Sequence, residues 1–147
     1  MTITSRIHHV FYTLLFILAI PVAAAADDPR LAMQGYDPVN YFTEARPAKG
    51  NPEFSFVWDG ERYLFANARH RDMFTSDPGR YSPQFPGWCA AALTRAEHVV
   101  PDPQNWIIIE GKLYLFGKPI GPKLFRENPA LVKASEENWK RVRKTEQ

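Results

Sequence analysis

The feature that most constrains the fold is an internal repeat. A shift of 51 residues aligns one half of the chain with the other without a gap. Both halves carry an acidic residue followed by glycine, Asp59-Gly60 and Glu110-Gly111, and the same Tyr-Leu-Phe run follows each pair. This dipeptide favours a tight hairpin turn because glycine adopts positive φ at no steric cost. Each half is therefore predicted to contain a β-hairpin.

The residue pattern predicts the same order of elements in both halves, a hairpin and then a helix that stops at Asp-Pro or Asn-Pro. The expected strands are residues 54–58, 61–65, 106–109 and 112–116, and the expected helices are residues 68–75, a segment opening at Gly121, and 130–143. A lone hairpin is marginally stable in water, so the two units should pack together or form one sheet. The predicted fold class is α+β, with two pseudo-repeated β-hairpin–helix units, antiparallel strands and a C-terminal helix. The alternative is a chance likeness between two ordinary hairpins.

The first 26 residues have the layout of a secretory signal peptide. A polar head precedes an apolar run at residues 10–20, and small residues then lead to a cleavage site before Asp27. The run is short for a membrane span, which needs about 20 apolar residues, so an uncleaved anchor is the alternative. The prediction is a periplasmic or secreted protein that does not bind a membrane after cleavage. Residues 27–34 then form a flexible start, and residues 35–144 form a single domain.

Charge gives no indication of a polyanionic partner. The formal net charge is +2, and removal of the leader takes away one basic residue, Arg6, and no acid. A nucleic-acid-binding domain needs a strongly basic face, so no nucleic-acid partner is expected.

Cys89 is the only cysteine, and it lies in the connector between the two halves, residues 81–90. An unpaired cysteine in an exported chain is an intermolecular disulfide partner, a buried thiol, or a reactive or metal-binding thiol. A thiolate with imidazoles suits copper or zinc, which makes Cys89, His98 and His70 the candidate metal ligands. The alternatives are a Cys89 that only fills core space and two histidines that only face solvent.

Two further readings concern what the connector binds or catalyses. No phosphate-binding loop or serine-centred motif is present, and nothing orients His98 as a base for Cys89, so the chain is not expected to be an enzyme. The second functional hypothesis is a module that binds a protein or a small apolar ligand, with Cys89 in the core. Its predicted pocket lies between the units and is lined by aromatic residues: Tyr81, Phe85, Trp88 and Trp106.

The order of these motifs resembles the YHS domain, and the second half is similar to exported bacterial proteins that carry this domain. The segments concerned are residues 37–39 (DPV), 54–66 (FSFVWDGERYLFA), 71–74 (RDMF), 77–81 (DPGRY), 83–90 (PQFPGWCA) and 105–115. The resemblance implies a small α+β module with a role in binding copper or other heavy metals. Where the metal-binding members carry cysteines, this chain has Asn40, Ala66 and His70, and only His70 can coordinate a metal.

Overall fold

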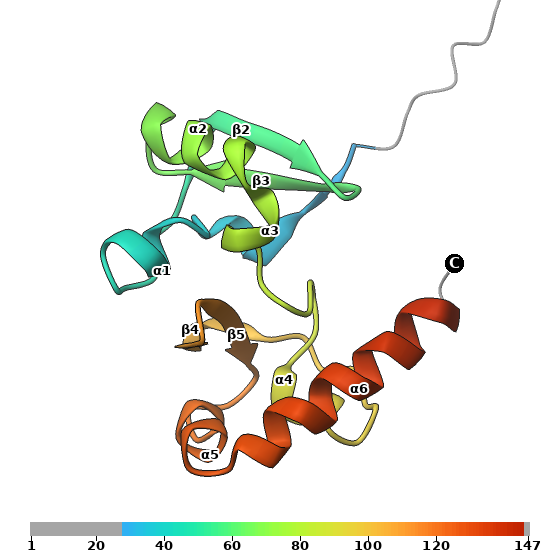
Figure 1. The fold of residues 1–147 in the computed structure, drawn as a ribbon. Coiled ribbons are helices and arrows are strands. Elements are labelled where there is room, and N and C mark those ends of the chain that lie inside the picture. The colour runs from blue at the N-terminus through green and yellow to red at the C-terminus, as the bar shows by residue number, and fades with distance from the viewer. Residues whose placement is uncertain (1–27, 146–147) are drawn as a thin grey trace, which may run out of the picture.

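The computed structural model describes residues 28–145. The predicted signal peptide, residues 1–26, lies outside this range. Figure 1 shows two hairpin-and-helix units, one above the other, which we call the first unit (residues 28–81) and the second unit (residues 82–145). The molecule is α+β, as predicted.

The first unit is a three-stranded sheet with the strand order β1-β3-β2. The strands β2 (Asn51–Trp58) and β3 (Glu61–Phe65) form the antiparallel hairpin, and β1 (Arg30–Leu31) pairs with β3 in parallel. Three short helical segments and one longer helix complete the unit: η1 (Ala32–Gly35), α1 (Asn40–Thr43), α3 (Pro78–Tyr81) and α2 (Ala68–Ser76). Asn67 caps α2 by accepting a hydrogen bond from the backbone N–H of His70.

The second unit is a two-stranded sheet covered by helices. Its elements are α4 (Ala90–Leu93), β4 (Asp102–Ile109), β5 (Lys112–Phe116), α5 (Gly121–Glu127) and α6 (Pro129–Thr145). The C-terminal helix α6 runs diagonally along the lower unit in Figure 1. Its apolar side chains lie against the core of this unit: Leu131, Val132, Trp139 and Val142.

The two hairpins pair their strands in corresponding registers. Phe56 faces Tyr63 in the first, and Ile107 faces Tyr114 in the second. Each register is interrupted at the start of its longer strand, between Asn51 and Ser55 and between Asp102 and Trp106. Both turns place their acidic residue and their glycine at positive φ, at 50° and 75° in the first hairpin and 51° and 75° in the second. These are the tight turns that the dipeptides predicted.

Aromatic rings fill the centre of both units. In the first, the ring of Phe74 lies 4.7 Å from that of Tyr63 and 5.2 Å from that of Phe65, measured between centroids. In the second, Phe125 lies 4.8 Å from Phe116. All five side chains are at most 1% exposed. Helix α2 and helix α5 are thus each held on their hairpin by one central phenylalanine.

Several segments are more regular than the sequence predicted, including the start of β2 at Asn51 rather than at residue 54. Residues 30–34, expected within a flexible start, form β1 and most of η1, because the backbone of Leu31 pairs with that of Arg62 in β3. Strand β4 begins at Asp102 rather than at Trp106. Its Pro103 is tolerated because a strand of a two-stranded sheet has a free edge, where a missing N–H costs nothing.

The hairpins pack together as separate sheets, which is one of the two arrangements expected. In each hairpin, the second strand already has a neighbour along its other edge. Strand β1 lies beside β3, and Pro83 of the connector forms a parallel bridge with Leu113 of β5. The connector backbone reinforces this position, since the N–H of Gln84 donates to the carbonyl of Leu113 at 2.9 Å. With both inner edges occupied, β3 and β5 cannot pair with each other.

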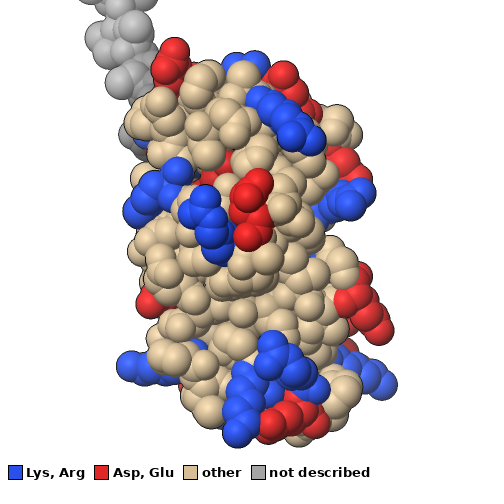
Figure 2. Space-filling view, turned by 90° about the vertical axis from the view of Figure 1, so that its left-hand side faces the viewer, with Lys and Arg blue, Asp and Glu red and all other residues tan. Residues whose placement is uncertain are grey.

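The surface mixes the two signs of charge. On the face turned to the viewer in Figure 2, basic and acidic side chains lie interspersed among uncharged ones. Within residues 28–145, no helix combines the length and the apolar character that a membrane crossing requires.

The carboxylate of Glu136 links helix α6 to β5, and its protonation should lower the stability of the fold in acid. Glu136 accepts a hydrogen bond from Lys112 at 2.8 Å and one from the hydroxyl of Tyr114 at 3.1 Å. The bond from Lys112, followed by that from Tyr114, lowers the pKa of Glu136 below its ordinary value of 4.5. A lowered folded-state pKa adds stability above the ordinary value, and this stability is lost as the pH falls through the folded-state pKa.

We therefore predict that Glu136→Gln reduces the free energy of unfolding at pH 7 and has a smaller effect below pH 4. Urea denaturation of both proteins across this range measures it. Glu137→Gln is the matched control, because Glu137 meets only Lys133, at 4.0 Å on the exposed face of the same helix. An equal effect of Glu136→Gln at both pH values would contradict the prediction.

Candidate functional site

Cys89 holds a structural position at the start of α4. Its side chain is 5% exposed. Its backbone N–H donates to the carbonyl of Val99 at 2.7 Å, and its Sγ accepts from the N–H of Gly117 at 3.2 Å. Cys89 therefore links the connector to the end of β5 through its thiol and to the loop before β4 through its backbone N–H.

Asp37 makes the corresponding contacts in the first unit. Its backbone N–H donates to the carbonyl of Ala48 at 2.9 Å, and its Oδ2 accepts from the N–H of Ala66 at 2.8 Å. Ala48 and Ala66 correspond to Val99 and Gly117 under the shift of 51 residues, whereas Asp37 and Cys89 are 52 residues apart and are equivalent only in their contacts. A buried carboxylate in one unit and a buried thiol in the other thus accept the hydrogen bond of the residue that follows the hairpin.

His70 is a partner of that carboxylate. Its side chain is buried, its Nδ1 lies 2.6 Å from Oδ2 of Asp37, and its Nε2 lies 3.5 Å from the hydroxyl of Thr43. The second unit has Gly121 at this position, where an added Cβ would lie 2.4 Å from the ring of Phe116. His70 therefore belongs to the first unit's core, whereas Cys89 belongs to the core of the second.

His98 is exposed and lies against the connector. Its ring centroid is 4.3 Å from that of Trp88, and its Nε2 lies 3.3 Å from the carbonyl of Gly87. Its ring therefore extends the aromatic surface of Trp88.

The three predicted metal ligands do not fit a metal ion in this arrangement. Within residues 28–145, no three His, Cys, Asp or Glu side chains gather closely enough to hold one. Cys89 Sγ already accepts a hydrogen bond, and His70 is engaged by Asp37. The positions that carry cysteines in metal-binding YHS members do come near Asp37, since Ala66 and His70 both contact its carboxylate, but neither offers a thiolate.

The four aromatic residues of the predicted pocket lie in different places. Tyr81 is buried in the first unit, 5.4 Å from the ring of Phe42, and Phe85 is buried in the second. Trp106 packs edge-on against Tyr41, 5.1 Å away, at the junction of the units. Of the four, only Trp88 lines the cleft of about 580 Å³ between the two units.

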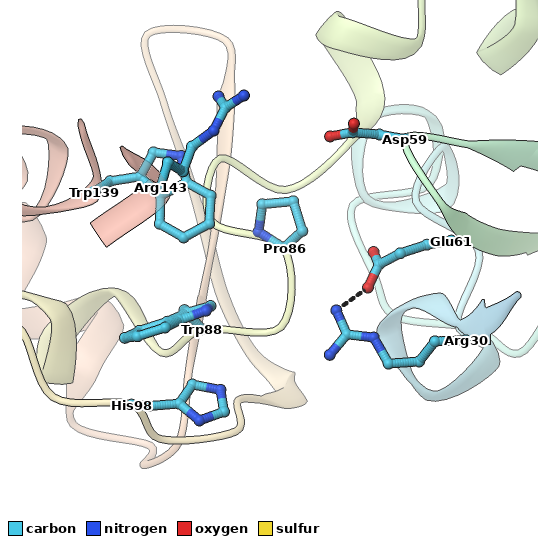
Figure 3. Close-up of a pocket in the computed structure, with 8 residues that line it drawn as sticks. All are labelled: Arg30, Asp59, Glu61, Pro86, Trp88, His98, Trp139 and Arg143. Carbon is cyan, nitrogen blue, oxygen red and sulfur yellow. Dashed lines mark hydrogen bonds and ion pairs between the residues drawn. The ribbon is translucent and has the colours of Figure 1, made fainter. Parts of the chain in front are cut away.

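Figure 3 shows the two sides of this cleft. The second unit supplies an aromatic side, in which Trp88 and Trp139 lie 6.1 Å apart and inclined by 66°, with His98 below Trp88. Arg143 lies 5.8 Å from the centroid of the Trp139 ring. Pro86 of the connector lies between the two sides.

The first unit supplies the opposite, charged side, made of Arg30, Asp59 and Glu61. Arg30 forms an ion pair with Glu61. Glu61 also accepts from the hydroxyl of Tyr63 at 3.4 Å, and burial, with a smaller contribution from Glu61, raises the pKa of Tyr63 so that it stays a donor. Among the described residues, Asp59 and Arg143 have no ion-pair partner within 4.0 Å.

Arg30 also separates this cleft from a neighbouring hollow. The second hollow has a volume of about 240 Å³ and shares Arg30, Glu61 and His98 with the cleft. The guanidinium lies against the connector, because a Cβ at Gly87 would be 3.3 Å from its Nη2. Gly87, at φ 74°, gives the connector this close approach.

Most of the residues around the cleft were not identified from the sequence. The sequence predicts Asp59 only as a turn residue, Glu61 within a strand, Arg30 within the flexible start and Trp139 within the C-terminal helix. One signal was available: Trp139 is followed by a run of basic residues near the end of α6, where a large aromatic residue in a polar stretch suggests a contact surface.

Comparisons with known proteins give no relative. No family model matches the chain, and neither the curated proteins nor the solved structures include a significant match.

The correspondence of Asp37 and Cys89 predicts unequal effects of truncation. Asp37→Ala leaves His70 and two backbone N–H groups without their acceptor, which should cost about 3–5 kcal/mol of unfolding free energy. Cys89→Ala removes one weak hydrogen bond, and the expected loss is about 1 kcal/mol. Urea denaturation at pH 7 measures both. Equal losses of unfolding free energy in the two variants would contradict this prediction.

The environment of Cys89 predicts a thiol that is unreactive in the native state. A thiol reagent should label it slowly in buffer and completely in guanidinium chloride, because the side chain is buried. Titration with Cu(I) or Zn(II) should give the same binding curve for the native chain and for Cys89→Ser. Tight stoichiometric binding that disappears in Cys89→Ser would instead support a metal site.

Proposed function

We propose that the protein is an exported, non-enzymatic binding module of the YHS-like type whose ligand occupies the cleft between the two units. The observation that carries the proposal is that both units build this cleft, one with an aromatic side and the other with a charged side. Its volume, about 580 Å³, falls within the range of small-molecule sites, roughly 300–1,000 Å³.

The polar groups of the cleft support a binding role. Asp59 and Arg143 reach the cleft without an ion-pair partner among the described residues, so both keep hydrogen-bonding capacity for a ligand. Trp88 and Trp139 offer apolar surface that packing leaves half-buried. Half-exposed tryptophans beside available charged groups are the combination that binding sites use for affinity and orientation.

The alternative function, binding of copper or zinc through Cys89, His98 and His70, has less support. It would require Cys89 to give up its contact with Gly117 and His70 to leave Asp37. His70 would also have to leave the core of the first unit, because Cys89 lies in the second.

The proposed location is the periplasm or the exterior of the cell. Its support is the signal-like leader, residues 1–26, and the resemblance to exported YHS proteins.

We also infer that the two units are copies of one module. The support is the shared register, the shared turn geometry and the equivalent contacts of Asp37 and Cys89. On this view the binding cleft arose where the two copies meet.

A screen of small-molecule fragments by two-dimensional NMR tests the binding proposal. Binding should shift the amide signal of Glu61 together with the indole signals of Trp88 and Trp139, which lie on opposite sides of the cleft. Asp59→Trp should block binding by filling the cleft. Glu110→Trp is the matched control, because it places the same side chain at the same φ in the other hairpin, away from the cleft. Fragment binding that survives Asp59→Trp, or that shifts only one unit, would contradict the proposal.

A further inference from the structure

The charges that line the cleft cancel. The first unit contributes Arg30, Asp59 and Glu61, and the second contributes Arg143, so two positive groups face two negative ones. Sites that attract ions present one sign of charge, because unlike charges around a ligand offset each other. An anion bound at Arg143 would approach Asp59 from the opposite side, and a cation at Asp59 would approach Arg143. The lining therefore favours a ligand without net charge.

The charged side also disfavours a purely apolar ligand. Such a ligand would remove water from Asp59 and from the Arg30–Glu61 pair and return no hydrogen bonds. Burying a charged group without a partner is costly. The ligand must therefore carry several hydroxyl or amide groups on the side that faces the first unit.

The aromatic side requires the opposite chemistry. Trp88 and Trp139 are half-buried, so each leaves part of its indole ring accessible, and an indole ring has an electron-rich face that attracts weakly positive C–H groups. A ligand with C–H groups on one face and hydroxyl groups around its edge satisfies both sides at once. A sugar ring has this distribution, because its ring C–H bonds point to the faces while equatorial hydroxyls project outward.

Resting on the proposed function, we propose that the ligand of the cleft is an uncharged oligosaccharide. Neighbouring hydroxyls can donate two hydrogen bonds to a carboxylate such as Asp59 and accept two from a guanidinium such as that of Arg143. The cleft is open to solvent, since Asp59, His98 and Arg143 are exposed and the Arg30 side chain is 67% exposed. An open cleft admits an internal segment of a longer chain rather than a single enclosed ring.

Isothermal titration with cellohexaose tests this ligand class on the chain without its leader. Cellohexaose is neutral and all its ring hydroxyls are equatorial, so both ring faces carry only C–H groups. Hexagalacturonate and the chitosan hexamer have similar length but carry negative and positive charges. We expect cellohexaose to bind and the two charged hexamers to bind more weakly. In two-dimensional NMR spectra, cellohexaose should shift the signals of Trp88, Trp139 and Glu61.

Two matched substitutions locate the binding. Asp59→Asn should weaken cellohexaose binding about tenfold, because a charge-assisted hydrogen bond becomes a neutral one. Glu110→Gln, the corresponding change in the other hairpin, should leave it unchanged. Both residues are exposed at hairpin tips, so neither change should prevent folding.

The outcomes separate the two proposals. If fragments bind in the cleft but cellohexaose does not, or if a charged hexamer binds more tightly, the oligosaccharide assignment is wrong and the binding function stands. If cellohexaose binds equally well to Asp59→Asn and the native chain, the assignment to this cleft is wrong. If neither fragments nor any hexamer shifts the NMR signals of residues in the cleft, both proposals are wrong.

Discussion

The contact that the rest of the structure depends on is the seating of Tyr41 between the two units. Its side chain is 1% exposed, its ring packs edge-on against Trp106, and its hydroxyl donates to the carbonyl of Pro103 at 2.9 Å. Burial, more than the neighbouring charges, raises the pKa of Tyr41, so it remains a donor. Tyr41 is a residue of the first unit that completes an apolar cluster with Leu113 and Leu115 of the second. This seam fixes the distance between the sides of the cleft.

The two hairpins and the helices that follow them were predictable because their determinants are local. Asp59-Gly60 and Glu110-Gly111 specify the turns, and alternating apolar residues specify the buried face of each strand. The bounds of β3 and β5 agree with the prediction. The β1 strand was not predictable, because Leu31 is ordered only by its pairing with Arg62, far away in the sequence.

The cleft was not predictable for the same reason. Its two sides come from residues that no sequence spacing relates, and contacts between the units, such as those of Tyr41 with Trp106 and Pro103, bring Asp59 and Trp139 to the same hollow. The single cysteine drew the prediction to Cys89 instead, whose side chain is buried in the second unit. In the first unit, Asp37 contacts His70 and accepts the hydrogen bond of Ala66, and in the second the thiol of Cys89 accepts that of Gly117, where no histidine fits beside Phe116.

The separation of the two sheets has a consequence for how the molecule opens. Within the described residues, the three-stranded and two-stranded sheets share no strand, so their backbone amides are protected by different hydrogen bonds. Local openings of this kind occur in contiguous cooperative units. Amide hydrogen exchange should thus divide the chain into two groups with distinct opening free energies. A molecule bound across both units would merge these groups into one, and would convert a pair of loosely coupled folding units into a single one.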